Sequence, residues 1–159
     1  MHQGHQGFSN SQHFNPDPNI SYEIASAKDN KFVLDASQDK KHFNELIIWE
    51  NHQGSNQKWR FVSNGDGTFL IKSAETGGTL GISEKKDKIG SQPLVGYQNG
   101  TNNEKRRIVP TGNGKGFIFE SMLNGLVLDI AQSKMKNGTE VIIYSNRNQD
   151  NQTWSIVPT

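Results

Sequence analysis

The sequence predicts an all-β fold built from three copies of one unit, and two recurring landmarks indicate it. The first landmark reads Leu34-Asp35, then Leu80-Gly81, then Leu128-Asp129. The second reads Gln57-Lys58-Trp59, then Glu104-Lys105-Arg106, then Gln152-Thr153-Trp154. Successive copies lie 46 to 48 residues apart in both landmarks, and Ser26, Ser73 and Ser121 keep the same period. A fixed period of this length indicates one supersecondary unit used three times.

Composition favours the same fold class. The chain of 159 residues has the length of one domain, and its hydrophobic content of 31% and mean hydropathy of −0.76 are low. Such values suit short strands that bury one side chain in two. We therefore expect a small core that the three units share.

Charge and cysteine content exclude several function classes. The net charge is +1 with interspersed signs, so the chain lacks the basic stripe that nucleic acid requires. The absence of cysteine excludes a disulfide framework and thiol chemistry. No apolar run could span a bilayer, and residues 1–20 hold no signal-peptide segment. We expect no membrane insertion, and a cytoplasmic or non-classically secreted protein.

The first unit, about residues 21–64, contains predicted strands at residues 22–24, 32–34, 47–49 and 59–61. Each is a short apolar, aromatic or β-branched run flanked by turn-forming residues. The segment Asn64-Gly-Asp-Gly67, which follows the last run, is a strong turn signal.

The second unit, about residues 65–112, has visible strand runs at residues 69–71, 94–95 and 107–109, with turns at Thr76-Gly-Gly78 and Gly112-Asn-Gly-Lys-Gly116. The third unit, about residues 113–159, has runs at residues 117–119, 126–128, 141–144 and 154–156, with turns at Asn124-Gly125 and Asn137-Gly138. No segment of the chain shows a sustained helical period.

Four strands per unit give about twelve antiparallel strands with threefold internal symmetry. Such strands can close into a six-stranded barrel capped by three hairpins, which removes exposed sheet edges and combines three weak cores. This architecture is the β-trefoil, and we assign it to residues 21–159. Trp59 and Trp154 are expected to lie in its core.

Residues 1–20 are predicted to be a flexible N-terminal tail. They are rich in Gln, Gly, Asn and His, nearly free of aliphatic residues, and closed by Pro16 and Pro18. The tail histidines, His2, His5 and His13, lack an acidic or thiol partner at a ligand spacing. We therefore predict no metal site.

An ordered set of polar and aromatic residues occurs in the first and third units. In the first unit it reads Asp35, Trp49, His52, Asn56 and Gln57. In the third unit it reads Asp129, Tyr144, Arg147, Asn151 and Gln152. The aromatic residue precedes the asparagine by seven residues in both units. Over residues 21–159 this set resembles that of the ricin B-chain-like lectins with Gln-x-Trp repeats.

The resemblance implies that the aspartate, the aromatic residue and the asparagine contact a sugar, with galactose or N-acetylgalactosamine as the expected ligand. A carboxylate can accept hydrogen bonds from two hydroxyls, and an aromatic ring offers a flat apolar platform to a pyranose. Asparagine adds a donor and an acceptor on one side chain. Gln57 and Gln152 are expected to support the pockets from behind, and His52 and Arg147 to add a polar contact.

The second unit departs from this set. Gly81 replaces the aspartate, Gly96 falls at the aromatic position with Tyr97 one place away, and Arg106 replaces the tryptophan. Only Asn103 keeps its type. We expect this unit not to bind sugar, which leaves two sites.

Other interpretations of these residues stay open on sequence alone. The two aspartates can be turn formers that accept hydrogen bonds from nearby backbone amides. Trp49 and Tyr144 can be hairpin packing residues, and the asparagines can be structural, since Asn103 persists without its partners.

The predicted function is a non-enzymatic lectin without catalytic residues, metal or cofactor. Its partners would be glycans or glycoconjugates, with a homodimer adding avidity. The chain has no nucleophile turn, metal-spaced histidines, phosphate loop or acid/base carboxylate pair, which argues against an enzyme. The alternatives are a β-trefoil protein-interaction module or protease inhibitor, and a sugar-targeting unit of a toxin or hydrolase supplied by a separate polypeptide.

Overall fold

The computed structural model describes residues 14–97 and 100–159, and strands dominate this part of the chain. The strands are β1 (Tyr22–Ser26), β2 (Phe32–Ala36), β3 (Leu46–Glu50), β4 (Trp59–Ser63), β5 (Phe69–Ser73), β6 (Thr79–Gly81), β7 (Leu94–Tyr97), β8 (Arg106–Pro110), β9 (Phe117–Ser121), β10 (Val127–Ile130), β11 (Val141–Tyr144) and β12 (Trp154–Pro158). Short 3₁₀ helices follow some of them: η2 (Lys40–His42), η3 (Ser55–Gln57), η4 (Ala131–Ser133) and η5 (Asp150–Gln152). The all-β prediction is confirmed.

Six strands close into a barrel. Its circuit runs β12, β1, β4, β5, β8, β9 and back to β12, with every neighbouring pair antiparallel. Ladders of five residue pairs (β12–β1, β4–β5, β8–β9) alternate with contacts of a single pair. Those single pairs are Tyr22 with Trp59, Phe69 with Arg106 and Phe117 with Trp154. The second landmark therefore supplies the residues at which the barrel closes.

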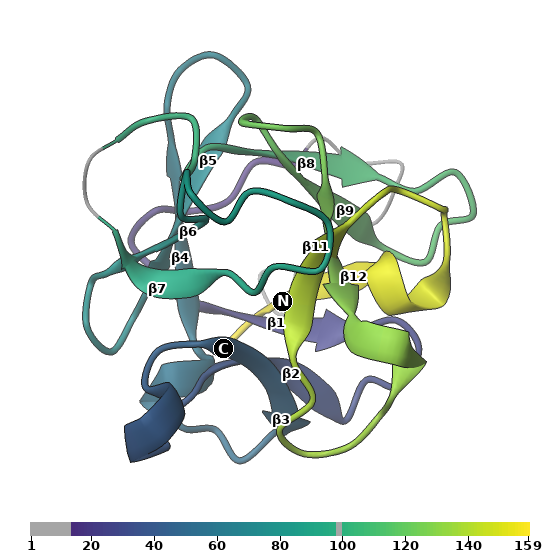
Figure 1. Ribbon diagram of the computed structural model, residues 1–159. Coiled ribbons are helices and arrows are strands. Elements are labelled where there is room, and N and C mark those ends of the chain that lie inside the picture. The colour runs from purple at the N-terminus through teal and green to yellow at the C-terminus, as the bar shows by residue number, and fades with distance from the viewer. Residues whose placement is uncertain (1–13, 98–99) are drawn as a thin grey trace, which may run out of the picture.

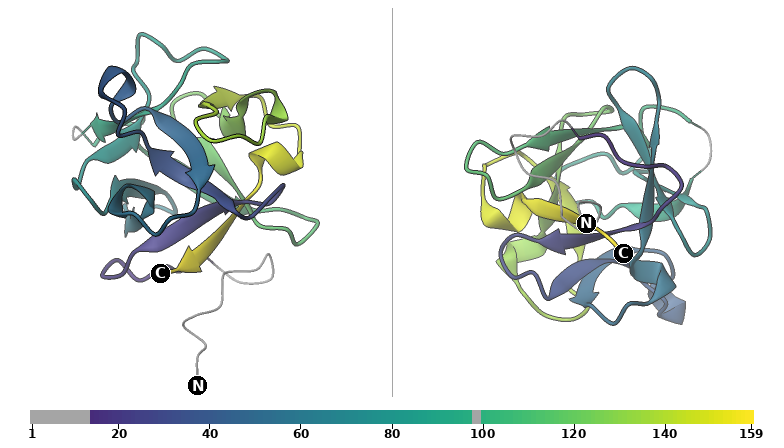
Figure 2. Two further views of the ribbon diagram at one scale, coloured as in Figure 1. Left: turned by 90° about the horizontal axis from the view of Figure 1, so that it is seen from below. Right: turned by 180° about the vertical axis from the view of Figure 1, so that it is seen from behind.

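The other six strands form three hairpins, β2–β3, β6–β7 and β10–β11, each attached to the barrel at its first strand. They surround the centre of the molecule in Figure 1, with β2–β3 at the bottom and β6–β7 at the left. The C-terminal end of β12 lies away from the β2–β3 hairpin in the side view of Figure 2. The candidate site residues lie on the β2–β3 and β10–β11 hairpins and on the loops and 3₁₀ helices that follow them.

The core contains the residues that recur with the period. Leu34, Leu80 and Leu128 have no exposed surface, and neither do Trp59 and Trp154. Full burial of one such leucine contributes about 1.5–3 kcal/mol to folding. The prediction that both tryptophans belong to the core is confirmed.

Two elements differ from the sequence expectations. Strand β6 was not predicted, because Thr79-Leu80-Gly81 contains only one large apolar residue and so forms no apolar run in the sequence. This segment becomes a strand by pairing with β7. Strand β10 begins at Val127 rather than at Leu126. The 3₁₀ helices span three residues each, too few to produce a helical period in the sequence.

The barrel also contacts a residue upstream of the predicted domain. The ring of Phe14 lies 5.0 Å from the rings of Phe61 and Phe69 and 5.5 Å from that of Phe117, measured between centroids. Most of the predicted tail, with His2, His5 and His13, lies outside the described residues. Within the described part, no helix has the length and apolarity needed to cross a membrane.

Candidate functional site

The β2–β3 hairpin presents Asp35 and Trp49 on one face. Asp35 pairs with Ile47, and Trp49 pairs with Val33. Because successive side chains of a strand point to opposite faces, Leu34 enters the core while Asp35 faces the other way. Trp49 keeps 39% of its surface exposed, whereas Asp35 keeps 3%. The hairpin therefore offers an exposed indole beside a recessed carboxylate.

The 3₁₀ helix η3 fixes the Asp35 carboxylate with two side-chain amides. Asn56 Nδ2 donates to Oδ1 and Gln57 Nε2 donates to Oδ2, both at 3.0 Å. The same two amides donate to the carbonyl oxygens of Ala36 at 3.2 Å and Glu50 at 3.1 Å. A carboxylate has about four acceptor positions, so each oxygen keeps capacity for a further donor.

Burial raises the pKa of Asp35 above the ordinary aspartate value of 3.8. The hydrogen bond from Gln57 and the positive charge of His52 lower this pKa and offset part of that rise. Desolvation disfavours the charged form of the acid, whereas donors that point at its oxygens favour it.

Four of the five residues predicted in the first unit line one cavity of about 290 Å³: Asp35, Trp49, His52 and Asn56. Gln57 lies behind it with no exposed surface, and its Oε1 accepts a hydrogen bond from the backbone N–H of His52 at 3.0 Å. Gln57 thus orients both the carboxylate and the loop that carries His52. We refer to this cavity as site one.

The third unit repeats the arrangement around Asp129, which is 5% exposed. Asn151 Nδ2 donates to Oδ1 at 3.2 Å, and Gln152 Nε2 donates to Oδ2 at 2.8 Å. Gln152 Oε1 accepts from the backbone N–H of Arg147 at 2.8 Å. Burial again raises the pKa of the aspartate, and the Gln152 hydrogen bond and the Arg147 charge oppose the rise.

Asp129, Tyr144, Arg147 and Asn151 line a cavity of about 470 Å³, which we call site three. It differs from site one in its aromatic wall, because the Arg147 guanidinium carbon lies 5.1 Å from the Tyr144 ring centroid. One face of this ring therefore carries a cation. Gln152 has no exposed surface and lies behind the pocket, as Gln57 does.

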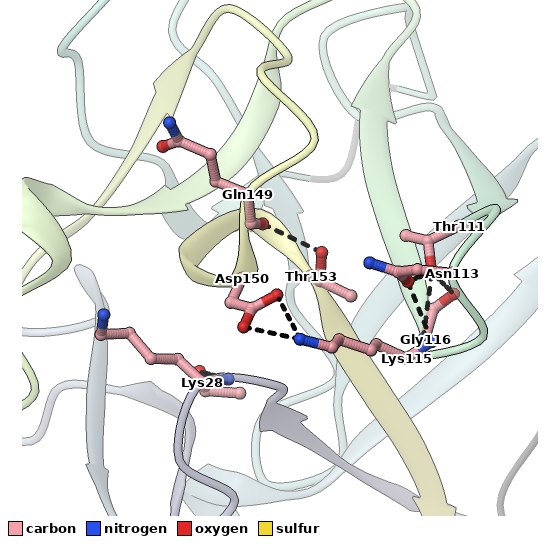
Figure 3. A network of polar contacts seen from close by, with 9 residues as sticks. Lys28, Thr111, Asn113, Lys115, Gly116, Gln149, Asp150 and Thr153 are labelled. Carbon is pink, nitrogen blue, oxygen red and sulfur yellow. Dashed lines mark hydrogen bonds and ion pairs between the residues drawn. The ribbon is translucent and has the colours of Figure 1, made fainter.

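Contacts with neighbouring loops hold the 3₁₀ helices that carry the amides. Lys115 Nζ lies 3.0 and 3.2 Å from the two carboxylate oxygens of Asp150, the first residue of η5 (Figure 3). Next to η3, one carboxylate oxygen of Glu75 accepts from Ser55 Oγ at 3.0 Å and from Gln38 Nε2 at 2.8 Å. These residues were missed by sequence reasoning, because each contact joins residues from different copies or loops and no spacing reveals it.

The second unit retains the supporting hydrogen bonds without the carboxylate. Gly81 pairs with Leu94, as Asp35 pairs with Ile47. Asn103 Nδ2 donates to the carbonyl of Ile82 at 2.9 Å, and Glu104 Oε1 accepts from the backbone N–H of Gly100 at 3.0 Å. These contacts correspond to those of Asn56 and Gln57.

The aromatic position of the second unit needs a correction. The spacing placed Gly96 there, but a β-bulge after Thr79 leaves Gly96 as the extra residue, and Tyr97 pairs with Thr79. Gly96 has φ +143°, a conformation that glycine adopts readily. The backbone register thus gives Tyr97 the place that Trp49 holds opposite Val33.

Arg106 occupies the tryptophan position of the second unit and has no exposed surface. Its guanidinium nitrogens have no hydrogen-bond partner within residues 14–97 and 100–159. Burial lowers its pKa to about 10. Trp59 and Trp154 instead donate their indole N–H to the carbonyls of Leu34 and Leu128, at 3.2 and 3.3 Å.

The geometry bears on the other interpretations of the site residues. Among the described residues, the hydrogen bonds of Asp35 and Asp129 come from side-chain amides rather than from turn amides. The asparagines carry a structural bond to a backbone carbonyl in all three units. No cluster of His, Cys, Asp or Glu suited to a metal ion occurs in the described part of the chain.

Comparison with known families gives one match. The family model described as ricin-type β-trefoil lectin domain-like matches residues 6–93 and residues 55–144. A comparison with curated protein sequences gives no significant match.

Solved structures with a similar fold include a designed protein, a lectin and an enzyme. The designed threefold-symmetric protein ThreeFoil has a TM-score of 0.78 and 25% identity, over 86% of this chain and 97% of its own. A ricin B-like lectin of Macrolepiota procera in complex with lactose has a TM-score of 0.77 and 22% identity, over 91% of this chain and 99% of its own. An exo-β-1,3-galactanase from Clostridium thermocellum has a TM-score of 0.79 and 22% identity, over 93% of this chain but only 32% of its own.

Proposed function

The chain belongs to the ricin-type β-trefoil lectin domain-like family, and we propose that it is a non-enzymatic lectin with two sugar sites. The sites are site one, around Asp35, and site three, around Asp129. The remaining residues of these sites are Trp49, His52, Asn56, Gln57, Tyr144, Arg147, Asn151 and Gln152. We also propose three pseudo-symmetric repeats, over about residues 21–64, 65–112 and 113–159, and the threefold symmetry of the designed ThreeFoil supports them.

One observation carries this proposal: the same group of side chains occurs twice, each time in a cavity. A recessed carboxylate receives two amide hydrogen bonds that fix its orientation. Its remaining acceptor positions can bind two neighbouring sugar hydroxyls, and such charge-assisted bonds contribute about 1.5–3 kcal/mol each before desolvation. The ring of Trp49 or Tyr144 can then cover the apolar face of the pyranose.

We propose galactose or N-acetylgalactosamine as the sugar bound in each site. The Macrolepiota procera lectin, which has the same fold, is complexed with lactose, a disaccharide that ends in galactose. Open sites of this kind bind weakly, with a Kd of about 0.1–1 mM, or about −4 to −5.5 kcal/mol. Two sites on one body, or a homodimer, would raise the avidity for multivalent glycoconjugates.

The second candidate function is a sugar-targeting unit that acts beside an enzyme or toxin. The similarity to a domain that makes up 32% of a galactanase chain favours it. This role uses the same two sites and the same sugar chemistry.

The proposal is tested on a glycan array with wild type, Asp35→Ala, Asp129→Ala and the double variant. We expect each single variant to lose part of the binding to galactose-terminated glycans and the double variant to lose nearly all of it. Glu84→Ala, which removes an exposed carboxylate from the second unit, serves as the matched control. Circular dichroism confirms that each variant is folded. Unchanged binding in a folded double variant would contradict the assignment of the sites.

A further inference from the structure

The Trp49 ring forms a wall of two cavities. One is site one, and the other is a smaller cavity of about 180 Å³. The two share Ser37, Asp39, Ile47 and Trp49 in their linings. A ligand that stacks on this indole in site one can therefore continue past it into the second cavity.

Unlike site one, the smaller cavity is built by all three units. The first unit supplies β3 and the loop around η2, the second supplies Gln92, and the third supplies Gly138 and Glu140. Two backbone hydrogen bonds attach the third unit's loop to β3: Gly138 N–H donates to the Ile48 carbonyl at 2.9 Å, and Ile48 N–H donates to the Thr139 carbonyl at 3.0 Å. Figure 1 shows this loop running beside β3 at the bottom of the molecule.

Two further contacts define the walls of this cavity. Gln92 Nε2 donates to the Leu46 carbonyl at 2.8 Å, which fixes its side chain at one wall. Elsewhere in the lining, a Cβ on Gly138 would lie 3.7 Å from the Trp49 ring, so the glycine backbone approaches the indole closely. Hydrogen bonds to the β3 backbone and the close approach of Gly138 to Trp49 therefore fix two parts of the cavity wall.

Carboxylates dominate the charge of the cavity. Asp39, Glu45 and Glu140 line it, and His42 is the only basic residue in its lining. His42 Nδ1 lies 2.9 Å from Glu45 Oε1, so this base already has an acidic partner. Carboxylates accept hydrogen bonds from neutral hydroxyls but repel a second anion.

From this geometry we propose that the cavity beyond Trp49 is a second subsite of site one, which binds the neutral sugar linked to the galactose at Asp35 and excludes anionic sugars. This inference rests on the proposed lectin function. The volume of about 180 Å³ is smaller than the roughly 300–1,000 Å³ of pockets for drug-sized ligands, so the subsite takes one sugar ring. Glu140 is the specificity-determining residue, because it lines this cavity but not site one, whereas Asp39 lines both and Glu45 is paired with His42.

The experiment uses the full chain carrying Asp129→Ala, since Glu140 also lines site three and that site must be silent. Isothermal titration compares methyl β-galactoside, N-acetyllactosamine, and N-acetyllactosamine sulfated on its N-acetylglucosamine. We expect the neutral disaccharide to bind about five- to tenfold more tightly than the monosaccharide, a gain of about 1–1.4 kcal/mol. Sulfation should reverse this gain, because the sulfate meets the carboxylates.

Glu140→Gln and Glu140→Lys test the role of the charge. We expect Glu140→Gln to raise the affinity for the sulfated disaccharide about threefold and Glu140→Lys about tenfold, with less than a twofold change for methyl β-galactoside. Glu84→Gln, at an exposed site in the second unit, should change none of the affinities. Added salt should weaken the discrimination against sulfate.

The outcomes separate the two proposals. If methyl β-galactoside fails to bind, the proposed galactose-binding function and the subsite are both overturned. If it binds, but the disaccharide binds no more tightly or the Glu140 variants leave the sulfate discrimination unchanged, the subsite alone is overturned.

Discussion

The first and second units share one scaffold but differ in the groups that could bind a ligand. Both bury the leucine of the first landmark, and in both the asparagine donates to a backbone carbonyl. Only the first unit has a carboxylate, at Asp35, where the second has Gly81. The comparison shows that the asparagine makes its structural hydrogen bond even in a unit that lacks the carboxylate. The aspartate is therefore the better marker of a sugar site.

The same comparison distinguishes the two barrel-closing residues. Trp59 fills its place with an indole that donates to the Leu34 carbonyl at 3.2 Å. Arg106 places a buried guanidinium in the corresponding position. Isolated buried charge is costly, so we expect the second unit to be the weakest part of the barrel.

The largest effect is expected from Trp59→Arg, which gives the first unit the cation of the second. The variant loses a fully buried indole and its hydrogen bond and gains an unpaired charge, so the free energy of unfolding should fall by about 3–5 kcal/mol. Urea denaturation measures it, with Trp59→Phe as the control that keeps an apolar ring. A loss below about 1 kcal/mol would mean that the barrel closure tolerates either residue.

The reverse change, Arg106→Trp, should stabilise the protein. Removing the buried charge is expected to add about 1–4 kcal/mol to the free energy of unfolding. At about 2–4 °C per kcal/mol for a chain of this size, thermal melting would show a clear rise in Tm. Arg106→Met separates the loss of charge from the gain of the indole. A lower Tm in both variants would show that the guanidinium is stabilising.

Gly81→Asp tests whether the second unit lacks only a carboxylate. Alone it should lower the free energy of unfolding by about 1–3 kcal/mol. The reason is that the new aspartate would meet the Glu104 carboxylate at the position where Gln57 donates an N–H to Asp35. Combined with Glu104→Gln, it should recover about 1 kcal/mol of this loss. A double-mutant cycle measures the coupling energy. Strictly additive effects would mean that the two positions do not meet.

A smaller effect is expected from pH, through the raised pKa of both aspartates. Their folded-state pKa lies above 3.8, so ionisation of these groups opposes folding, and their cost to stability disappears as the pH falls through that pKa. Sugar binding needs the ionised form and should weaken over the same range. Titration calorimetry between pH 7 and pH 4 checks this. An affinity that stays constant to pH 4 would contradict it.

The features that could be predicted from sequence are those that recur along the chain. The landmark leucines and tryptophans keep one period, which gave the all-β class and the core. Asp35 and Trp49 were found because Asp129 and Tyr144 repeat them.

Features that depend on local irregularities or on contacts outside the repeated pattern were missed. The bulge at Gly96 shifts the aromatic register by one residue, and the Lys115–Asp150 contact joins segments that share no pattern. Phe14 reaches the barrel from outside the repeats. Such contacts form only after the chain folds, and they do not recur with the period of the sequence, so the repeat pattern does not predict them.

Side-chain amide resonances during a galactose titration test the central claim most directly, because all three units carry the asparagine. Two-dimensional ¹⁵N NMR can follow the NH₂ groups of Asn56, Asn103 and Asn151 in one sample. We predict that Asn56 and Asn151 shift with saturating sugar while Asn103 stays in place. Equal shifts at all three, or a shift at Asn103 alone, would contradict a lectin with its sites in the first and third units.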